Sequence, residues 1–269
     1  MRNLPINRLV ISAPFGNWFN CPGATRTLGT YTLRHRAGTF KRLWRILSTV
    51  RYWRRPQAWI NKLGLPNPGI AHLYQDHQDA AANLRLDNSI VSIHGFDSDE
   101  WSELGSWVAF RLPIPAAVEL NLSCPNVGHT IGVEKAAFAV ARVRARMLAA
   151  GRRAVPIIAK IGPVRWDAYA EAAVVAGADS LHLCNTIPTP GGGISGTPLK
   201  QFSLWAVEGC RKRWPDMHII GGGGVSSQAD IWDYHYAGAD AVAVGSALFN
   251  PLNWKRVRKW ALDESTHWS

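Results

Sequence analysis

Short apolar runs alternate along the chain with longer stretches that carry apolar residues at helical spacing. The runs are rich in Val, Ile and Leu and almost continuously apolar, which is typical of parallel strands buried on both faces. They predict strands at 8–14, 27–33, 89–95, 117–123, 155–161, 179–185, 217–223 and 241–247.

Helical patterns fill most of the intervals between these runs. They predict helices at about 75–86, 99–110, 133–150, 166–176, 201–214, 227–237 and 247–262. The stretch 133–150 gives the clearest pattern, because it is rich in helix formers and is followed by Gly151, a typical C-cap residue. The interval between 8–14 and 27–33 is too short for a full crossover helix, so the first helix is expected to be truncated or missing.

Strand and helix alternate without a composition break or an internal repeat. Over 269 residues this order predicts an α/β fold, a (β/α)₈ TIM barrel with a shortened first βα unit, in a single domain over 1–269. A doubly wound sheet is the alternative.

Composition narrows the class of protein. Apolar residues make up 47% of the chain, and its four cysteines form no CxxC pair, which is typical of a reducing compartment. No apolar run reaches the length of a membrane span, so we expect a soluble, cytoplasmic protein. The net charge of +11 implies affinity for nucleic acid, acidic lipid or phosphorylated ligands, with a solvated basic surface as the alternative.

Polar or glycine-rich groups follow five consecutive predicted strands. Active sites of barrels lie at the C-terminal ends of the strands, so these groups are expected to share one rim. In chain order they are "NLSCPN" (121–126), Lys160, "CNT" (184–186), "GGGGVSS" (221–227) and "VGSA" (244–247).

The last two of these segments predict a phosphate site. Glycine-rich turns at the start of helices present backbone N–H groups to an anion. The residues concerned are Gly223, Gly224, Gly245 and Ser246, and tight βα turns are the alternative reading. Lys160 ends an apolar strand, where a lysine is costly unless it is paired, contacts a ligand or reaches the solvent.

Asn61, Asn121, Asn126 and Asn185 carry carboxamides, which can recognise a flat ligand that displays both carbonyl and N–H edges. Each could instead be a turn or cap residue. The thiol of Cys124 has an unperturbed pKa of about 8.5 and is suited to acid–base catalysis. A buried, inert cysteine is the alternative.

Taken together, these segments resemble the dihydroorotate dehydrogenase family. The resemblance covers about residues 8 to 250 and includes "NLSCPN", "AKIGP", "CNT", "GGGISGTPL", "IIGGGGV", "AGADAVAVGSALF", "INKLGLPNPGI" and "GTYTLRHRAG". Members are FMN-dependent (β/α)₈ barrels that oxidise dihydroorotate to orotate in pyrimidine biosynthesis. The resemblance therefore implies an FMN-dependent oxidoreductase acting on a CH–CH bond.

The resemblance also implies roles for individual residues. Cys124 would be the general base that removes a proton from ring carbon 5, while hydride leaves carbon 6 for flavin N5, and a thiol here is typical of the soluble branches. Substrate-binding positions are Asn61, Gly64, Leu65, Asn126, Asn185 and Thr186. Cofactor-binding positions are Asn121, Lys160, Gly196, Gly223, Gly224, Gly245 and Ser246. No metal site is expected.

The chain departs from the family pattern in three places. A second family lysine is replaced by Asn17 and Gly29 at its two known positions, "GNP" reads 38–40 "GTF", and the loop 187–190 is short. A compact, diverged member acting on another planar ring therefore stays open. So do a dihydrouridine synthase-like enzyme acting on transfer RNA and a degenerate barrel that binds FMN or phosphate without turnover. The absence of an appended RNA-binding segment disfavours nucleic acid.

The partners follow less directly from the sequence. The substrate is expected to be a small planar molecule, and the electron acceptor is not identified. The stretch 41–56 predicts a basic amphipathic helix, which would either cap the barrel or make weak peripheral contact with a membrane without being an obligate anchor. A homodimer is also left open.

Overall fold

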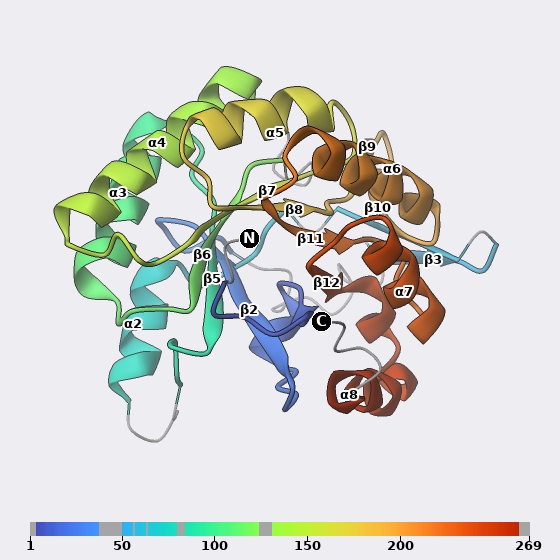
Figure 1. Cartoon of the computed structure of the whole chain (residues 1–269). Coiled ribbons are helices and arrows are strands. Elements are labelled where there is room, and N and C mark those ends of the chain that lie inside the picture. Colours follow the sequence, from blue (N-terminus) through green and yellow to red (C-terminus); the bar gives the residue numbers. More distant parts are fainter. Residues whose placement is uncertain are drawn as a thin grey trace.

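The computed structural model describes residues 4–37, 50–55, 57–62, 64–79, 84–123 and 131–263. Within these residues, parallel strands close into a barrel in the order β1-β12-β11-β8-β7-β6-β5-β2, with helices around it (Figure 1). The strands are β1 (Leu9–Ile11), β2 (Ala24–Tyr31), β5 (Ser89–Ile93), β6 (Ala117–Asn121), β7 (Ile157–Ile161), β8 (Ser180–Leu183), β11 (His218–Gly222) and β12 (Ala241–Val244). The predicted (β/α)₈ barrel is confirmed, and the doubly wound alternative is excluded.

The helices lie outside the barrel and follow the strands in chain order. They are α2 (Ile70–Gln78), α3 (Ser98–Ser106), which continues into a π-helical turn (Trp107–Arg111), α4 (Val133–Ala149), α5 (Trp166–Val175), α6 (Pro198–Arg213), α7 (Gln228–Tyr236) and α8 (Trp254–Leu262). No helix among the described residues combines the length and apolarity needed to cross a membrane.

Two of the predicted helices differ from the structure. The helix expected at 75–86 begins at Ile70 and ends at Gln78, because Asp79 has an extended backbone. The helix expected at 247–262 is divided into the 3₁₀ turns η5 (Ser246–Phe249) and η6 (Pro251–Asn253) and the helix α8. Pro251 has no N–H to continue a helix from the preceding turn, which explains the interruption.

The first βα unit is shortened, as the spacing predicts. Only the 3₁₀ turn η1 (Phe15–Asn17) lies between β1 and β2. A Cβ on Gly16 would lie 2.2 Å from the carbonyl oxygen of Thr27, so the turn packs directly against β2.

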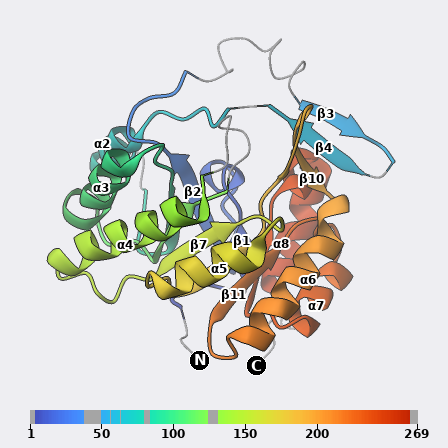
Figure 2. The ribbon, with the colours of Figure 1, turned by 90° about the horizontal axis from the view of Figure 1, so that it is seen from above.

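A second, antiparallel sheet was not predicted. Its order is β3 (Val50–Trp53), β4 (Ala58–Asn61), β10 (Gly192–Gly196) and β9 (Ile187–Thr189). Its β3–β4 hairpin projects away from the barrel (Figure 2). The helix predicted over 41–56 is therefore wrong at Val50–Trp53, where β-formers such as Val and Trp pair with β4, and 41–49 lie outside the described residues.

Alternation along the barrel strands sorts side chains between its interior and the helices. Val118, Leu120 and Ile157 pack into the outer core under the helices. The inward-facing strand residues Val10, Ile90, Ala117, Ile158, Ile220, Ala241 and Ala243 form an inner apolar cluster, which Leu4 joins from the segment before β1. Toward the C-terminal ends of these strands the inward-facing residues are polar, namely Ser92, Glu119, Asn121, Lys160 and His182.

Candidate active site

Two predicted asparagines meet at the C-terminal end of the barrel. Asn185 Nδ2 donates to Asn121 Oδ1 at 2.9 Å and to Ser123 Oγ at 3.2 Å. Asn185 Oδ1 in turn accepts from the backbone N–H of Thr186 at 2.9 Å. Only 5% of Asn121 and 9% of Asn185 is exposed, so the two amides form a buried pair.

Lys160 lies beside this pair, because the β6–β7 register places it opposite Asn121. It is only 6% exposed, and its Nζ is 3.6 Å from Oε1 of Glu119. The free-energy cost of burying Lys160 is thus offset by an ion pair inside the barrel, and the side chain does not extend to the solvent.

Glu119 is the centre of a buried polar cluster that the sequence reasoning missed. Its carboxylate accepts from Ser92 Oγ at 2.8 Å and contacts His182 Nδ1 at 2.7 Å. Burial alone would raise the pKa of Glu119, but the charge of Lys160 and the contacts with His182 and Ser92 lower it to about 2. The sequence did hold a signal for this cluster. Glu119 lies two residues before Asn121 on the same strand, and His182 lies opposite Lys160, so all four side chains face the barrel interior.

The imidazole of His182 is neutral in this cluster. Burial, and then the charge of Lys160, lower its pKa, and the contact with Glu119 only partly offsets them. Burial also raises the pKa of the Cys184 thiol to about 11. Cys184 therefore stays protonated at neutral pH and does not suit the role of a base.

The predicted phosphate-binding glycines come from three loops that approach one another. Gly196, Gly223 and Gly224 have positive φ values of 100°, 108° and 70°. A Cβ on Gly224 would lie 3.0 Å from the carbonyl oxygen of Gly196, and one on Gly245 would lie 3.5 Å from Cβ of Ser12. The missing side chains let these loops pack closely, with Gly196 and Gly224 buried, Gly223 and Gly245 partly exposed, and Ser246 beginning η5.

The start of α7 is less open to an anion than the glycine-rich sequence suggested. Ser227 caps the helix in a capping box with Asp230. The backbone N–H groups of Ser226 and Ser227 both donate to Asp230 Oδ2 at 2.8 Å, and Lys200 pairs with the same carboxylate. A phosphate would therefore be met by the glycine backbone before this helix, because the serine amides are already bonded.

The remaining predicted substrate positions lie on or after β4. Asn61 is 7% exposed and pairs with Gly193 of β10. Gly64 and Leu65 have positive φ values of 71° and 59°. Their carbonyl oxygens accept from Arg36 Nε at 3.2 Å and Asn67 Nδ2 at 2.9 Å, which holds this turn in place.

Cys124 and Asn126 lie outside the described residues, so the proposed base stays a prediction. Ser123, the residue before Cys124, is placed against Asn185. Among the described residues, no group of three or more His, Cys, Asp or Glu side chains is arranged to hold a metal ion.

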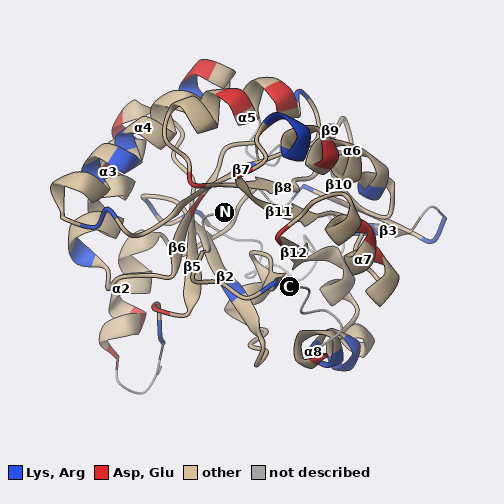
Figure 3. Cartoon of the chain, viewed as in Figure 1, with Lys and Arg blue, Asp and Glu red and all other residues tan. Residues whose placement is uncertain are grey.

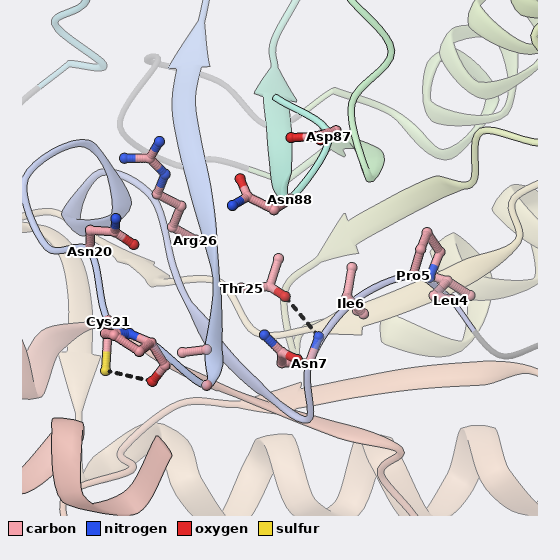
Figure 4. Close-up of a pocket in the computed structure, with 13 residues that line it drawn as sticks. Leu4, Pro5, Ile6, Asn7, Asn20, Cys21, Thr25, Arg26, Asp87 and Asn88 are labelled. Carbon is pink, nitrogen blue, oxygen red and sulfur yellow. Dashed lines mark hydrogen bonds between the residues drawn. The ribbon is translucent and has the colours of Figure 1, made fainter. Parts of the chain in front are cut away.

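A cavity of about 530 Å³ lies at the other end of the barrel strands (Figure 4). It is lined by residues before β1, by the segment that replaces the first helix, by the start of β2 and by the turn before β5, including Asn7, Asn20, Arg26 and Asn88. None of the predicted site residues lines it. The strand ends and not this cavity therefore define the candidate site.

The fold and the site together define a (β/α)₈-barrel enzyme whose active site lies on the C-terminal rim. Residues 25–259 match the dihydroorotate dehydrogenase family. The chain belongs to the dihydroorotate dehydrogenase family and is an oxidoreductase of that family.

Individual relatives agree with this assignment. The chain is 35% identical over 247 residues to the catalytic subunit of dihydroorotate dehydrogenase B (NAD(+)) of Desulforudis audaxviator, covering 82% of this chain and 74% of the relative. It is 31% identical over 210 residues to dihydroorotate dehydrogenase A (fumarate) of Lactobacillus delbrueckii subsp. bulgaricus, covering 71% and 66%. The ligand-free crystal structure of dihydroorotate dehydrogenase from Eimeria tenella shares the fold, with a TM-score of 0.70 and 20% sequence identity. The match covers 95% of this chain and 83% of the Eimeria chain.

Proposed function

We propose that the chain binds FMN and oxidises dihydroorotate to orotate. The observation that carries this proposal is the placement of buried Lys160 beside the Asn121–Asn185 pair, at the barrel end where the glycine loops converge. A fixed positive charge, planar amides and glycine loops without side chains are what an anionic, ring-containing cofactor and a planar substrate require.

The residues at this rim fit FMN. Gly196, Gly223, Gly224, Gly245 and Ser246 would hold its phosphate through backbone contacts, while Lys160 and Asn121 would lie against its ring. When bound, FMN supplies the hydride acceptor, and the charge of Lys160 favours negative charge on the reduced ring. The hydroxyl of Thr186 is buried and has no hydrogen-bond partner among the described residues, which leaves it available to a ligand.

The substrate would be held by Asn61, Gly64, Leu65, Asn126, Asn185 and Thr186. Cys124 would take the proton from ring carbon 5, because a thiol can ionise near neutral pH where a hydroxyl cannot. The pKa of Cys184 is raised by burial, so that thiol does not compete for this role.

The charge of the chain does not favour a nucleic-acid substrate. Lys and Arg positions in the described part of the chain are spread over several helices and the β3–β4 hairpin, as Figure 3 shows, and do not form one stripe. A dispersed excess of positive charge fits a solvated surface better than a backbone-tracking groove.

The test begins with the purified protein, which should be yellow and release FMN. Anaerobic addition of dihydroorotate should bleach the flavin, whereas unmodified transfer RNA with a reductant should give no dihydrouridine. A colourless protein that does not take up FMN would exclude the cofactor, and an FMN-loaded protein that dihydroorotate leaves oxidised would exclude the substrate. Fumarate, NAD⁺, a quinone and oxygen, added separately to the reduced protein, would then identify the electron acceptor.

A further inference from the structure

Glu119 lies deeper in the barrel than the proposed ligand contacts, yet it is connected to them. The residue is fully buried, and its Oε1 accepts from Ser92 and lies 3.6 Å from Lys160 Nζ. Its Oε2 contacts His182 Nδ1 at 2.7 Å. The carboxylate therefore joins β5, β6, β7 and β8 below the rim.

From Ser92 a continuous series of side-chain hydrogen bonds leads up to the rim. Ser92 Oγ is 2.9 Å from Thr30 Oγ1, and Thr30 Oγ1 is 3.2 Å from Asn121 Nδ2. Asn121 Oδ1 is in turn 2.9 Å from Asn185 Nδ2. This relay, defined here as Glu119, Ser92, Thr30, Asn121 and Asn185, ends at the amide pair.

The charge of Glu119 fixes the direction of every bond in the relay. An ionised carboxylate only accepts, so the Ser92 hydroxyl must donate to it. The single hydroxyl proton of Ser92 is then committed, so Thr30 donates to Ser92, and Thr30 accepts from the amide N–H of Asn121. With its nitrogen turned toward Thr30, Asn121 presents its oxygen to Asn185.

We propose that Glu119 is a positioning residue that sets the amide orientation of Asn121 and Asn185 through Ser92 and Thr30. The relay commits one N–H of Asn121 to Thr30 and its oxygen to Asn185, so the second N–H, which has no partner among the described residues, is the group that can donate to a ligand. This rim then favours ring carbonyl oxygens over ring N–H groups. The role in ligand binding rests on the proposed function, whereas the direction of the relay can be tested without substrate.

The ligand-free test uses the tautomer of His182. Its Nε2 is buried and has no hydrogen-bond partner among the described residues, so the tautomer is decided at Nδ1, where Glu119 accepts. In Glu119→Gln the Ser92 hydroxyl and the Lys160 ammonium group lie on the same side of the new amide. If the relay keeps its direction, both are donors, so the amide oxygen must face them. The amide nitrogen then faces His182, and the imidazole proton must move to Nε2.

We therefore expect histidine-¹⁵N spectra of the protein as isolated to show His182 as the Nδ1–H tautomer, and those of Glu119→Gln to show the Nε2–H tautomer. His182→Gln identifies the signals. Should Glu119→Gln not fold because Lys160 is left unpaired, the double variant Glu119→Gln/Lys160→Met poses the same question. An unchanged tautomer in the variant, or an Nε2–H wild type, would overturn the proposed direction.

The ligand-binding test compares two serines of β5 that point to opposite sides of the sheet. Both Ser92 and Ser89 are fully buried, but Ser89 bonds to Arg26 and to the carbonyl of Arg85, outside the relay. Ser92→Ala should weaken orotate binding, followed by the flavin absorption change, by about tenfold, whereas Ser89→Ala should leave it at the wild-type value. Equal affinities in both variants would exclude the positioning role, while a wild type that binds no orotate would count against the proposed function and not against the relay.

Discussion

Asn17 and Gly29 hydrogen-bond to each other in both directions. Gly29 N–H donates to Asn17 Oδ1 at 3.0 Å, and Asn17 Nδ2 donates to the Gly29 carbonyl at 3.1 Å. The resemblance to the family implies that its second lysine occupies one or the other of these two positions. Their contact brings the two positions together, and neither residue carries a positive charge.

We predict that Gly29→Ala destabilises the fold by about 2–4 kcal/mol, from a left-handed backbone and a steric clash together. Gly29 has φ of 101°, and an added Cβ would lie 2.6 Å from the carbonyl oxygen of Ser92. Gly151→Ala is the control, because Gly151 has φ of 70° with no atom within 4 Å of the added Cβ. Urea unfolding of both variants measures the difference, and equal losses would show that the contact with Ser92 is relieved without cost.

Cys124→Ala should keep its FMN but lose about 10²–10⁴-fold in the rate of flavin reduction by dihydroorotate, the usual contribution of a positioned base. Cys124→Ser should retain more activity and require higher pH, because a hydroxyl ionises less readily than a thiol. Anaerobic stopped-flow reduction measures these rates. Cys210→Ala, a change in a buried thiol on α6, should lower stability without slowing reduction. A Cys124→Ala variant that reduces at the wild-type rate would remove Cys124 from the mechanism.

Gly224→Ala should weaken FMN binding by about tenfold or more, because the added methyl group fills the approach between Gly224 and Gly196. Gly177→Ala imposes similar backbone strain, with φ of 98°, but its Cβ would meet nothing closer than 3.8 Å. Flavin release followed by fluorescence should separate the two variants. If both lose FMN equally, general strain explains the effect and the glycine loops do not hold the phosphate.

His218 should make the fold less stable in mild acid. Burial lowers its pKa to about 4 from an unfolded value of about 6.5. The unfolded chain therefore binds this proton first, so the contribution is complete above about pH 6.5 and is lost as the pH falls toward about 4. The loss amounts to about 3 kcal/mol. His218→Gln should remove this loss, so its melting temperature should fall less steeply than that of the wild type between about pH 6.5 and about pH 4. A variant with the wild-type slope would show that other groups are responsible.

The barrel could be predicted because its strands follow a local rule. Val118 and Leu120 alternate with inward residues on a single short strand, and the same pattern recurs at every barrel strand. The active-site end followed from the position of Lys160 at the end of such a run. The pairing of Asn121 with Asn185 could also be anticipated, because parallel strands bring their C-terminal ends together.

The features that were missed depend on contacts between distant segments. The small sheet forms because Ala58–Asn61 pairs with Gly192–Gly196, and nothing local in either stretch indicates the other. The segment Val50–Trp53 combines helical spacing with β-forming residues, and pairing with β4 decides between them. Glu119 was overlooked because a charged residue inside an apolar run is explained only by Lys160 and His182, which lie on other strands.

The small sheet has a consequence for how the site can open. Asn61, proposed to contact the substrate, pairs with Gly193, while Gly196, proposed to contact the cofactor phosphate, pairs with Ala58 at the other end of the same ladder. The segment after β2 and the segment after β8, which lie on opposite sides of the barrel, are thereby joined into one antiparallel sheet. A movement of this sheet that shifted Asn61 to admit substrate would also shift Gly196 and its contact with the cofactor phosphate. Substrate entry and cofactor binding would therefore be coupled through the β4–β10 ladder.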